Sequence, residues 1–345
     1  MMKRTVLFVI IFGVTMAASL FQTVSVSMAR PVNLTYSIFF PPTHEQCKAG
    51  VLWAKEVEKR SNGTVKITVF PGGTLTNANQ CYEGVENGIS DIGMSCFAYN
   101  RGRFPMMEAI DLPLGYPDGQ TATHVANEFY TTFQPKELAG VKVLYLHAHG
   151  PGLLHTKQAV KSIDDLKGMK IRSTGLSAKV VEVLGAIPVA MPQPSTYEAL
   201  QKGVVEGTFA PIETLKGWRQ AEVIKYTTGC YSIGYTTAMF VVMNRNKWNS
   251  LPKKIQSIIQ QVSEEWVNVH GDIWDKVDIE GQNYTLSLGN EFIQIDNNEQ
   301  QRWETAVEPI IQNYITESGK KNIDGSKVIS GLRQLIDKYS KIYLK

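Results

Sequence analysis

Strand and helix patterns alternate along the first part of the chain, and the alternation starts again after its middle. Residues 33–40 and 64–70 alternate apolar and polar side chains, residues 89–96 form a third strand pattern, and helical patterns separate the three. This order predicts a mostly parallel sheet with helices on both faces. The break Gly150-Pro151-Gly152 precedes a second series of shorter strand and helix patterns that ends near residue 220. The sequence therefore predicts two α/β halves.

Two further segments are expected to join these halves. Residues 231–244 form an apolar run that is long for one small sheet, so we expect a strand that crosses between the halves. After Pro252 a helical pattern continues to about Leu286, a length of about 50 Å at 1.5 Å per residue. Two domains that share a helix need this length, whereas one ordinary domain does not. The tail, residues 299–343, is predicted to be mostly helical.

The first 29 residues differ in kind from the rest. Lys3 and Arg4 precede an apolar run over residues 6–21, and residues 27–29 fit the small-x-small pattern of a cleavage site. These features are typical of a secretory signal peptide. A retained membrane anchor is the alternative, although small and polar residues inside the run make it a poor spanning helix. We therefore expect export to the periplasm with removal of residues 1–29.

The balance of charge excludes one class of partner. The chain has a formal charge of +3, and removal of Lys3 and Arg4 would leave +1. No basic run with interleaved aromatic residues occurs in the sequence. Nucleic-acid binding is therefore not expected.

Four cysteines remain after the predicted cleavage, and they are Cys47, Cys81, Cys96 and Cys230. Their spacing includes no C-x-x-C pair and no familiar metal-ligand pattern. An oxidising compartment favours disulfides. Because Cys47 and Cys81 both lie on predicted helices of the first half, we expect a bridge between them. Cys96 and Cys230 border apolar strands and are expected to be free and buried.

Arg172 occupies a position at which ligands bind in open α/β sheets. A short strand over residues 169–172 ends there, and residues 173–175 lead into a helix. A guanidinium presents a planar fork of donors that matches a carboxylate with two parallel hydrogen bonds. A surface ion pair with Asp164 or Asp165 is the alternative. Position alone leaves both interpretations open.

Common enzyme motifs are absent from the sequence. It contains no G-x-S-x-G elbow, no G-x-x-x-x-G-K-[ST] loop and no G-x-G-x-x-G after a strand. His147 and His149 point to one face of a predicted strand, but no carboxylate or cysteine at zinc spacing accompanies them, so we interpret them as structural or ligand-lining. We therefore expect no catalytic residues, no metal and no cofactor.

Several stretches of the exported part resemble one known family. In the second half they are Leu166–Arg172 (LKGMKIR), Leu184–Val189 (LGAIPV) and Tyr197–Gly207 (YEALQKGVVEG). Gly84–Gly93 (GVENGISDIG) and the helix after Trp248–Pro252 (WNSLP) fit the same pattern. Over nearly all of its exported length the chain resembles the DctP-type solute-binding subunits of tripartite ATP-independent periplasmic (TRAP) transporters.

The resemblance implies an α/β, two-lobed periplasmic binding protein fold with a mixed, mostly parallel sheet in each lobe, a crossing strand and a long bridging helix. We expect residues 30–149 and 236–277 in lobe I and residues 150–235 and 278–345 in lobe II, with the ligand cleft between them. The family also implies closure of the lobes on a small organic acid and delivery to the small and large membrane subunits of the permease. We expect the receptor to be a monomer.

The family clamps the ligand carboxylate with an arginine that falls on Arg172. Sialate-binding members carry a second arginine in the stretch that here reads Gly150–Leu154, an asparagine at Ala210 and a glutamate at Cys96. They also have an asparagine near Phe39. This pocket therefore has fewer polar groups than theirs, and Arg172 is expected to hold the anion alone.

Aromatic side chains take the place of those polar groups. Five of them lie at strand ends that should face the cleft, and they are Phe39, Phe40, Phe97, Tyr99 and Phe209. Trp218 is expected to cover the cleft. Ordinary core packing is the alternative for each ring. As a group the rings favour an aromatic or largely apolar monocarboxylate, because rings stack and exclude water.

Glu213 has two interpretations. It follows a strand at the start of a helix, where an acid stabilises the helix dipole. Alternatively it accepts a hydrogen bond from a ligand ammonium, ring N–H or hydroxyl, which would admit aromatic amino acids and indole acids. The other residues predicted to bind ligand are His44, Cys96, His149, Thr174 and Gln193.

Other functions stay open at this point. A receptor for a C4-dicarboxylate, a hydroxy acid or a sugar acid is the first alternative. An exported α/β enzyme with His149 or Glu213 as its base is the second, and a sensor that docks a signalling receptor is the third.

Overall fold

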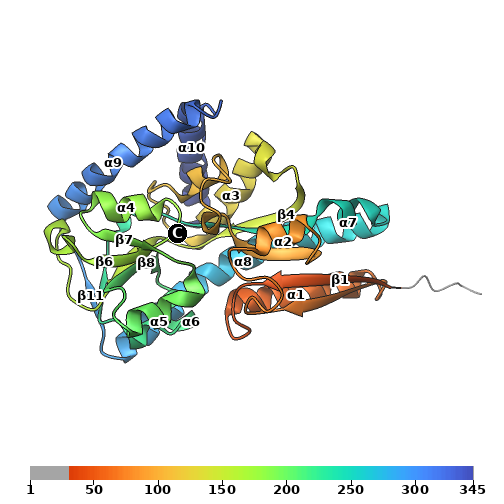
Figure 1. Ribbon diagram of the computed structural model, residues 1–345, viewed down its shortest axis with the longest axis horizontal. Helices are drawn as coiled ribbons and strands as arrows, with labels where there is room; N and C mark the ends of the chain where they lie inside the picture. Colours follow the sequence, from red (N-terminus) through yellow and green to blue (C-terminus); the bar gives the residue numbers. More distant parts are fainter. Residues whose placement is uncertain (1–30, 345) are drawn as a thin grey trace, which may run out of the picture. The chain divides into compact units, whose positions relative to one another are not determined.

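Two β-sheets organise the chain (Figure 1). The computed structural model describes residues 31–344, so the predicted signal peptide lies outside the described residues. The first sheet contains β1 (Val32–Ile38), β2 (Val65–Phe70), β3 (Ile92–Cys96), β4 (Val141–Ala148) and β10 (Ala238–Asn244). Their order across the sheet is β2-β1-β3-β10-β4.

The second sheet is built mainly from the later half. It contains β5 (Gly152–Thr156), β6 (Lys170–Ser173), β7 (Ile187–Ala190), β8 (Gly207–Pro211), β9 (Tyr226–Thr228) and β11 (Glu291–Ile293). Their order is β11-β9-β5-β8-β6-β7.

In the first sheet β1 runs parallel to β2 and β3, while β10 is antiparallel to β3 and β4. In the second, β6 is parallel to β7 and β8, while β5 is antiparallel to β8 and β9. The predicted mixed sheets of a two-lobed α/β fold are thus confirmed.

Helices connect and cover these strands. They are α1 (Glu45–Arg60), α2 (Cys81–Glu86), α3 (Gly119–Phe133), α4 (Ser177–Val183), α5 (Thr196–Gln201), α6 (Thr214–Gly217), α7 (Arg245–Ser250), α8 (Lys253–Ser287), α9 (Asn297–Gly319) and α10 (Gly325–Tyr343). The long helix predicted after Pro252 is α8, which packs against α1, α3, β4 and α6. The tail is helical as predicted; α9 packs on α4, and α10 packs on α3. No helix within residues 31–344 combines the length and apolarity that a membrane span requires.

The crossing strand is shorter than predicted. Residues Tyr231–Ile233 form a 3-10 turn, and β10 starts only at Ala238. Tyr235 pairs with Gly152 beside the second sheet, whereas β10 pairs within the first. The crossing segment thus pairs with the second sheet at Tyr235 and with the first sheet from Ala238, as expected for a segment that runs between the two halves.

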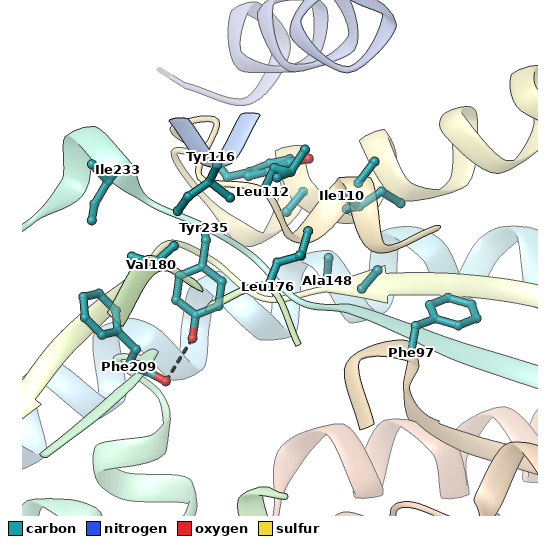
Figure 2. Packing of buried hydrophobic residues seen from close by; sticks show 14 of the residues in the cluster. Phe97, Ile110, Leu112, Tyr116, Ala148, Leu176, Val180, Phe209, Ile233 and Tyr235 are labelled. Carbon is teal, nitrogen blue, oxygen red and sulfur yellow. Dashed lines mark hydrogen bonds between the residues drawn. The ribbon is translucent and has the colours of Figure 1, made fainter. Parts of the chain in front are cut away.

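A hydrophobic core continues from one sheet to the other. Figure 2 shows Phe97, which follows β3, and Ala148 of β4 in the same cluster as Val180 of α4 and Phe209 of β8. Ile110, Leu112 and Tyr116 of the connector residues 107–116 belong to the same cluster. In the same cluster the Tyr235 hydroxyl donates a hydrogen bond of 2.9 Å to the Phe209 carbonyl oxygen. Apolar contacts therefore join the lobes where the chain crosses.

The predicted bridge between Cys47 and Cys81 is wrong. All four cysteines are free and buried. Cys47 lies on α1, which covers the sheet face that carries Ile38 and Met94. Cys81 lies against Gly93, whose neighbour Met94 points to the opposite face because successive strand residues alternate. The first sheet thus separates the two thiols.

Candidate ligand-binding site

A buried cavity lies where the carboxyl ends of parallel strands from the two sheets meet. Its volume is about 30 Å³. On this scale a water molecule takes about 10–15 Å³. It is lined by Phe39, Phe40, Cys96, Tyr99, His149, Arg172, Thr174, Gln193, Pro211, Glu213, Thr214, Trp218, Tyr235, Thr237 and Met239. The position agrees with the general rule for ligand sites of open α/β sheets.

Arg172 reaches the cavity from the carboxyl end of β6. The residue is only 3% exposed. Its Nε donates a 3.1 Å hydrogen bond to the Met191 carbonyl oxygen, which fixes the plane of the guanidinium. The loop after β6 approaches the first sheet at Gly175, where an added Cβ would lie 2.8 Å from the Cβ of Ala98. Glycine at this place lets the two strand ends come together around Arg172.

No carboxylate neutralises Arg172 within residues 31–344. The Nε bond to Met191 is the only hydrogen bond of its side chain there, and no salt bridge includes it. Besides Arg172, the only lining residue that could carry a positive charge is His149. Burial lowers the pKa of His149 to about 4, and the nearby charge of Arg172 acts in the same direction. His149 is therefore neutral at pH 7, and Arg172 supplies the positive charge of the cavity.

Aromatic rings from both sheets close the cavity. Phe39 and Phe40 follow β1, and their ring centroids lie 4.0 Å apart. Trp218 follows α6 and stacks on Phe39 with centroids 6.1 Å apart and an interplanar angle of 18°. Tyr99 meets Phe39 edge-on at 5.7 Å. The rings of the first sheet and Trp218 of the second thus meet across the cleft.

A buried hydrogen bond also crosses the cleft beside these rings. His44 Nε2 lies 2.8 Å from Glu213 Oε2, and both residues are almost fully buried. The backbone N–H of Gln46 donates to His44 Nδ1 at 3.2 Å. Since Nδ1 accepts, the imidazole proton resides on Nε2, which donates to Glu213. Gly217 makes room for the pair, because an added Cβ would lie 2.7 Å from Glu213 Oε2.

Asp278 of α8 holds the backbone of Glu213 in place. The backbone N–H of Glu213 donates a 2.8 Å hydrogen bond to Asp278 Oδ1. Burial raises the pKa of Asp278 well above its ordinary value, and the charge of Glu213 raises it further. Asp278 therefore holds a proton at pH values where an exposed aspartate is ionised.

A larger, open pocket of about 490 Å³ adjoins the cavity. Glu213 and Trp218 line both spaces and form the wall between them. The outer pocket is otherwise lined by Pro41, Thr43, His44, Glu45, Tyr197, Lys216, Gly217, Arg219, Val277 and Glu280.

Most of the residues predicted to bind ligand lie at the cavity. Three do not. Phe97 packs in the core against Phe104 and Phe240. Phe209 is a fully buried residue of β8, and its ring lies 6.2 Å from that of Tyr235. His44 lines the outer pocket and reaches the cavity only through its bond to Glu213.

Sequence reasoning missed five lining residues. Pro211 and Thr214 flank Glu213, and Tyr235, Thr237 and Met239 come from the crossing segment. The last three are spaced by two, so they share one face of an extended chain. That spacing, on a segment already predicted to cross between the halves, was the available signal.

Within residues 31–344 no group of three or more His, Cys, Asp or Glu side chains is arranged to hold a metal ion.

The bacterial extracellular solute-binding protein family 7 (DctP) matches residues 36–317 of this chain. Among curated proteins, the C4-dicarboxylate-binding periplasmic protein DctP of Rhodobacter capsulatus is 25% identical over 311 residues, which cover 87% of this chain and 92% of that protein.

Solved structures of TRAP solute-binding proteins have the same fold. One from Desulfovibrio salexigens, an open complex, is 34% identical with a TM-score of 0.79, over 89% of this chain and 96% of that one. Another, from a marine metagenome, is specific for aromatic acid ligands and holds 3-hydroxybenzoate. It is 30% identical with a TM-score of 0.86, over 90% of this chain and 99% of that one. The Rhodobacter protein is thus a receptor for C4-dicarboxylates and the metagenome protein one for aromatic acids.

Proposed function

The chain belongs to the DctP family of bacterial extracellular solute-binding proteins, and from this premise we propose that it is the TRAP-transporter receptor for an aromatic or largely apolar monocarboxylic acid. Arg172 clamps the carboxylate in this proposal, and the rings around the cavity hold the rest of the ligand. The loaded receptor then delivers the acid to the membrane subunits of the permease for uptake driven by an ion gradient.

The unpaired guanidinium of Arg172 carries the proposal. A buried charge without a partner costs about 3–5 kcal/mol, so the site is strongly biased toward binding an anion. The bond from Nε to Met191 leaves the two Nη groups for that anion. A carboxylate matches two parallel N–H donors better than any other common anion of its size.

The rings support an apolar body for the ligand. Phe39, Phe40, Tyr99 and Trp218 line the cavity, and aromatic walls favour flat, apolar groups through stacking. The metagenome relative, which binds aromatic acids, has a similar fold over nearly the whole chain.

The alternatives fit the same lining less well. A C4-dicarboxylate has a second anionic group, yet Arg172 is the only lysine or arginine among the cavity residues and Glu213 would repel that group. A sugar acid has no aromatic ring face to stack on Phe39, Phe40 and Trp218, which line the same cavity. The Rhodobacter relative binds C4-dicarboxylates and belongs to the same family, but family membership alone does not identify the ligand of this chain.

Identification of a ligand that copurifies with the protein tests the proposal. We expect an aromatic or largely apolar monocarboxylic acid to be released when the exported protein is denatured and the extract is analysed by mass spectrometry. A released dicarboxylate or sugar acid would contradict it. A chemically altered product after incubation with that acid would favour the enzyme alternative instead.

We also propose export with cleavage after Ala29, which leaves Arg30 as the first residue. The mass of the intact periplasmic protein tests this directly. The mass of residues 30–345 is expected, and a full-length chain in the membrane fraction would favour the retained anchor.

A further inference from the structure

Trp218 has a buried hydrogen-bond donor without an acceptor. Its Nε1 is inaccessible and has no partner within residues 31–344. An indole nitrogen can only donate, and a buried donor left unpaired is unfavourable. Trp218 lines the cavity together with Glu213. An acceptor on a bound ligand would satisfy this N–H.

Glu213 offers a hydrogen-bond acceptor on the wall that carries the Trp218 donor. His44 donates to its Oε2, and within the described part of the chain this is the only hydrogen bond of the Glu213 side chain. Oε1 therefore remains an acceptor for a ligand donor. The wall between the cavity and the outer pocket thus presents one donor and one acceptor.

Only some polar groups of a ligand can pair with both the Trp218 N–H and the Glu213 carboxylate. A hydroxyl accepts from Trp218 and donates to Glu213. An ammonium donates to Glu213 but leaves the Trp218 N–H unpaired. A carbonyl or an ether accepts from Trp218 but brings its oxygen toward the Glu213 carboxylate.

Gln193 is a second lining side chain with an unpaired donor. It is 7% exposed and lines the cavity, and its Nε2 has no partner within residues 31–344. With Arg172 and Trp218 it makes three lining side chains whose donors are not all paired within residues 31–344. An ammonium, which donates only, is poorly matched to such a lining.

We infer that the ligand is a hydroxylated aromatic monocarboxylate whose hydroxyl is recognised by Trp218 and Glu213. This inference rests on the proposed function, because Arg172 takes the carboxylate. It makes Trp218 and Glu213 specificity-determining residues and excludes the amino acids that Glu213 alone would admit.

Calorimetry with matched acids tests the inference. Phenylacetate is the parent, and the hydroxylated acids are mandelate, 3-hydroxyphenylacetate and 4-hydroxyphenylacetate. Phenylglycine replaces the hydroxyl by an ammonium, and 3-methoxyphenylacetate keeps the oxygen but cannot donate. At least one hydroxylated acid is expected to bind about 10-fold more tightly than phenylacetate, as one well-formed hydrogen bond implies. Equal binding of the parent and all three hydroxylated acids, or an equal gain for phenylglycine or the methoxy acid, would overturn it.

Variants of Trp218 and Glu213 test whether these two residues cause the tighter binding of hydroxylated acids. Trp218→Phe keeps a ring against Phe39 but removes the N–H, and Glu213→Gln keeps the shape but removes the charge. Each is expected to abolish most of the hydroxyl gain while phenylacetate still binds. Trp248→Phe, on α7, is the matched control and should retain the full gain. A gain that survives both wall variants would overturn the inference and leave the proposed function standing. If no aromatic acid binds the unmodified protein, the proposed function fails, and the inference falls with it.

Discussion

Among residues 31–344, the Arg172 side chain has one hydrogen-bond partner, the Met191 carbonyl, in a place where a guanidinium normally needs a carboxylate. The sequence placed this residue correctly at a strand end. Which neighbours face the same space could not be predicted, because the direction of a side chain at a strand end depends on register. Phe39 and Phe97 both follow strands of the first sheet, yet only Phe39 lines the cavity.

Arg172→Ala is expected to weaken ligand binding by about 1.5–3 kcal/mol, which is roughly 10- to 150-fold. Arg172→Lys keeps the charge but loses the planar fork, so it should recover only part of the affinity. Calorimetry measures both. Arg302→Ala, an exposed arginine paired with Asp164 and Glu299, should bind like the unmodified protein. Equal affinity of the Arg172 variants and the control would remove Arg172 from the site.

The four cysteines should be reduced and unreactive in the folded protein. Burial raises the pKa of Cys47 to about 11 and that of Cys81 and Cys230 to about 12, and it raises the pKa of Cys96 as well. Since the thiolate is the reactive form, a thiol reagent should label none of them in the native state. In urea without reductant, all four should react. Two unlabelled cysteines in urea would indicate a disulfide.

At the scale of elements, α8 is the part that the sequence predicted best. Its helical pattern runs without interruption from Lys253, so its length could be predicted within one residue. The short strands β9 and β11 were missed, because three residues are too few to show alternation. The crossing segment was predicted to run between the halves, but its start was placed too early, because the apolar pattern of residues 231–237 does not distinguish a 3-10 turn from a strand.

Asp278 places a titratable group between α8 and the loop that carries Glu213. The folded protein holds its proton more tightly than the unfolded chain, so the stability from this group is fully present below its ordinary pKa of 3.8 and is lost as pH rises through the raised pKa. Asp278→Asn mimics the protonated form at every pH. The variant should therefore gain stability over the unmodified protein as pH rises, by up to about 1.4 kcal/mol per unit in this window.

Urea unfolding at pH 5, 6.5 and 8 measures this difference. Asp337→Asn removes an exposed carboxylate that pairs with Lys341, and its effect should stay within about 0.5 kcal/mol at each pH. A stability difference for Asp278→Asn that does not change with pH would show that the carboxyl is already ionised in the folded state.

For the whole molecule, the small cavity implies motion. A space of about 30 Å³ is far below the volume of an aromatic acid, so entry requires the walls to separate. Trp218 and the bond between His44 and Glu213 join the two sides of the cleft, and they must part and re-form around the ligand. The two-sheet plan that permits this could be predicted from the repeated alternation. The contacts across the cleft could not, because they join residues more than 160 positions apart.

Calorimetric titration at pH 7 with three classes of acid tests the central claim most directly. The aromatic monocarboxylates are benzoate, phenylacetate and indole-3-acetate, the dicarboxylate is succinate, and the sugar acid is glucuronate. At least one aromatic acid should bind about 100-fold more tightly than succinate or glucuronate, because burial of a second, unpaired charge costs about 3 kcal/mol. Tighter binding of succinate or glucuronate than of every aromatic acid would contradict the account.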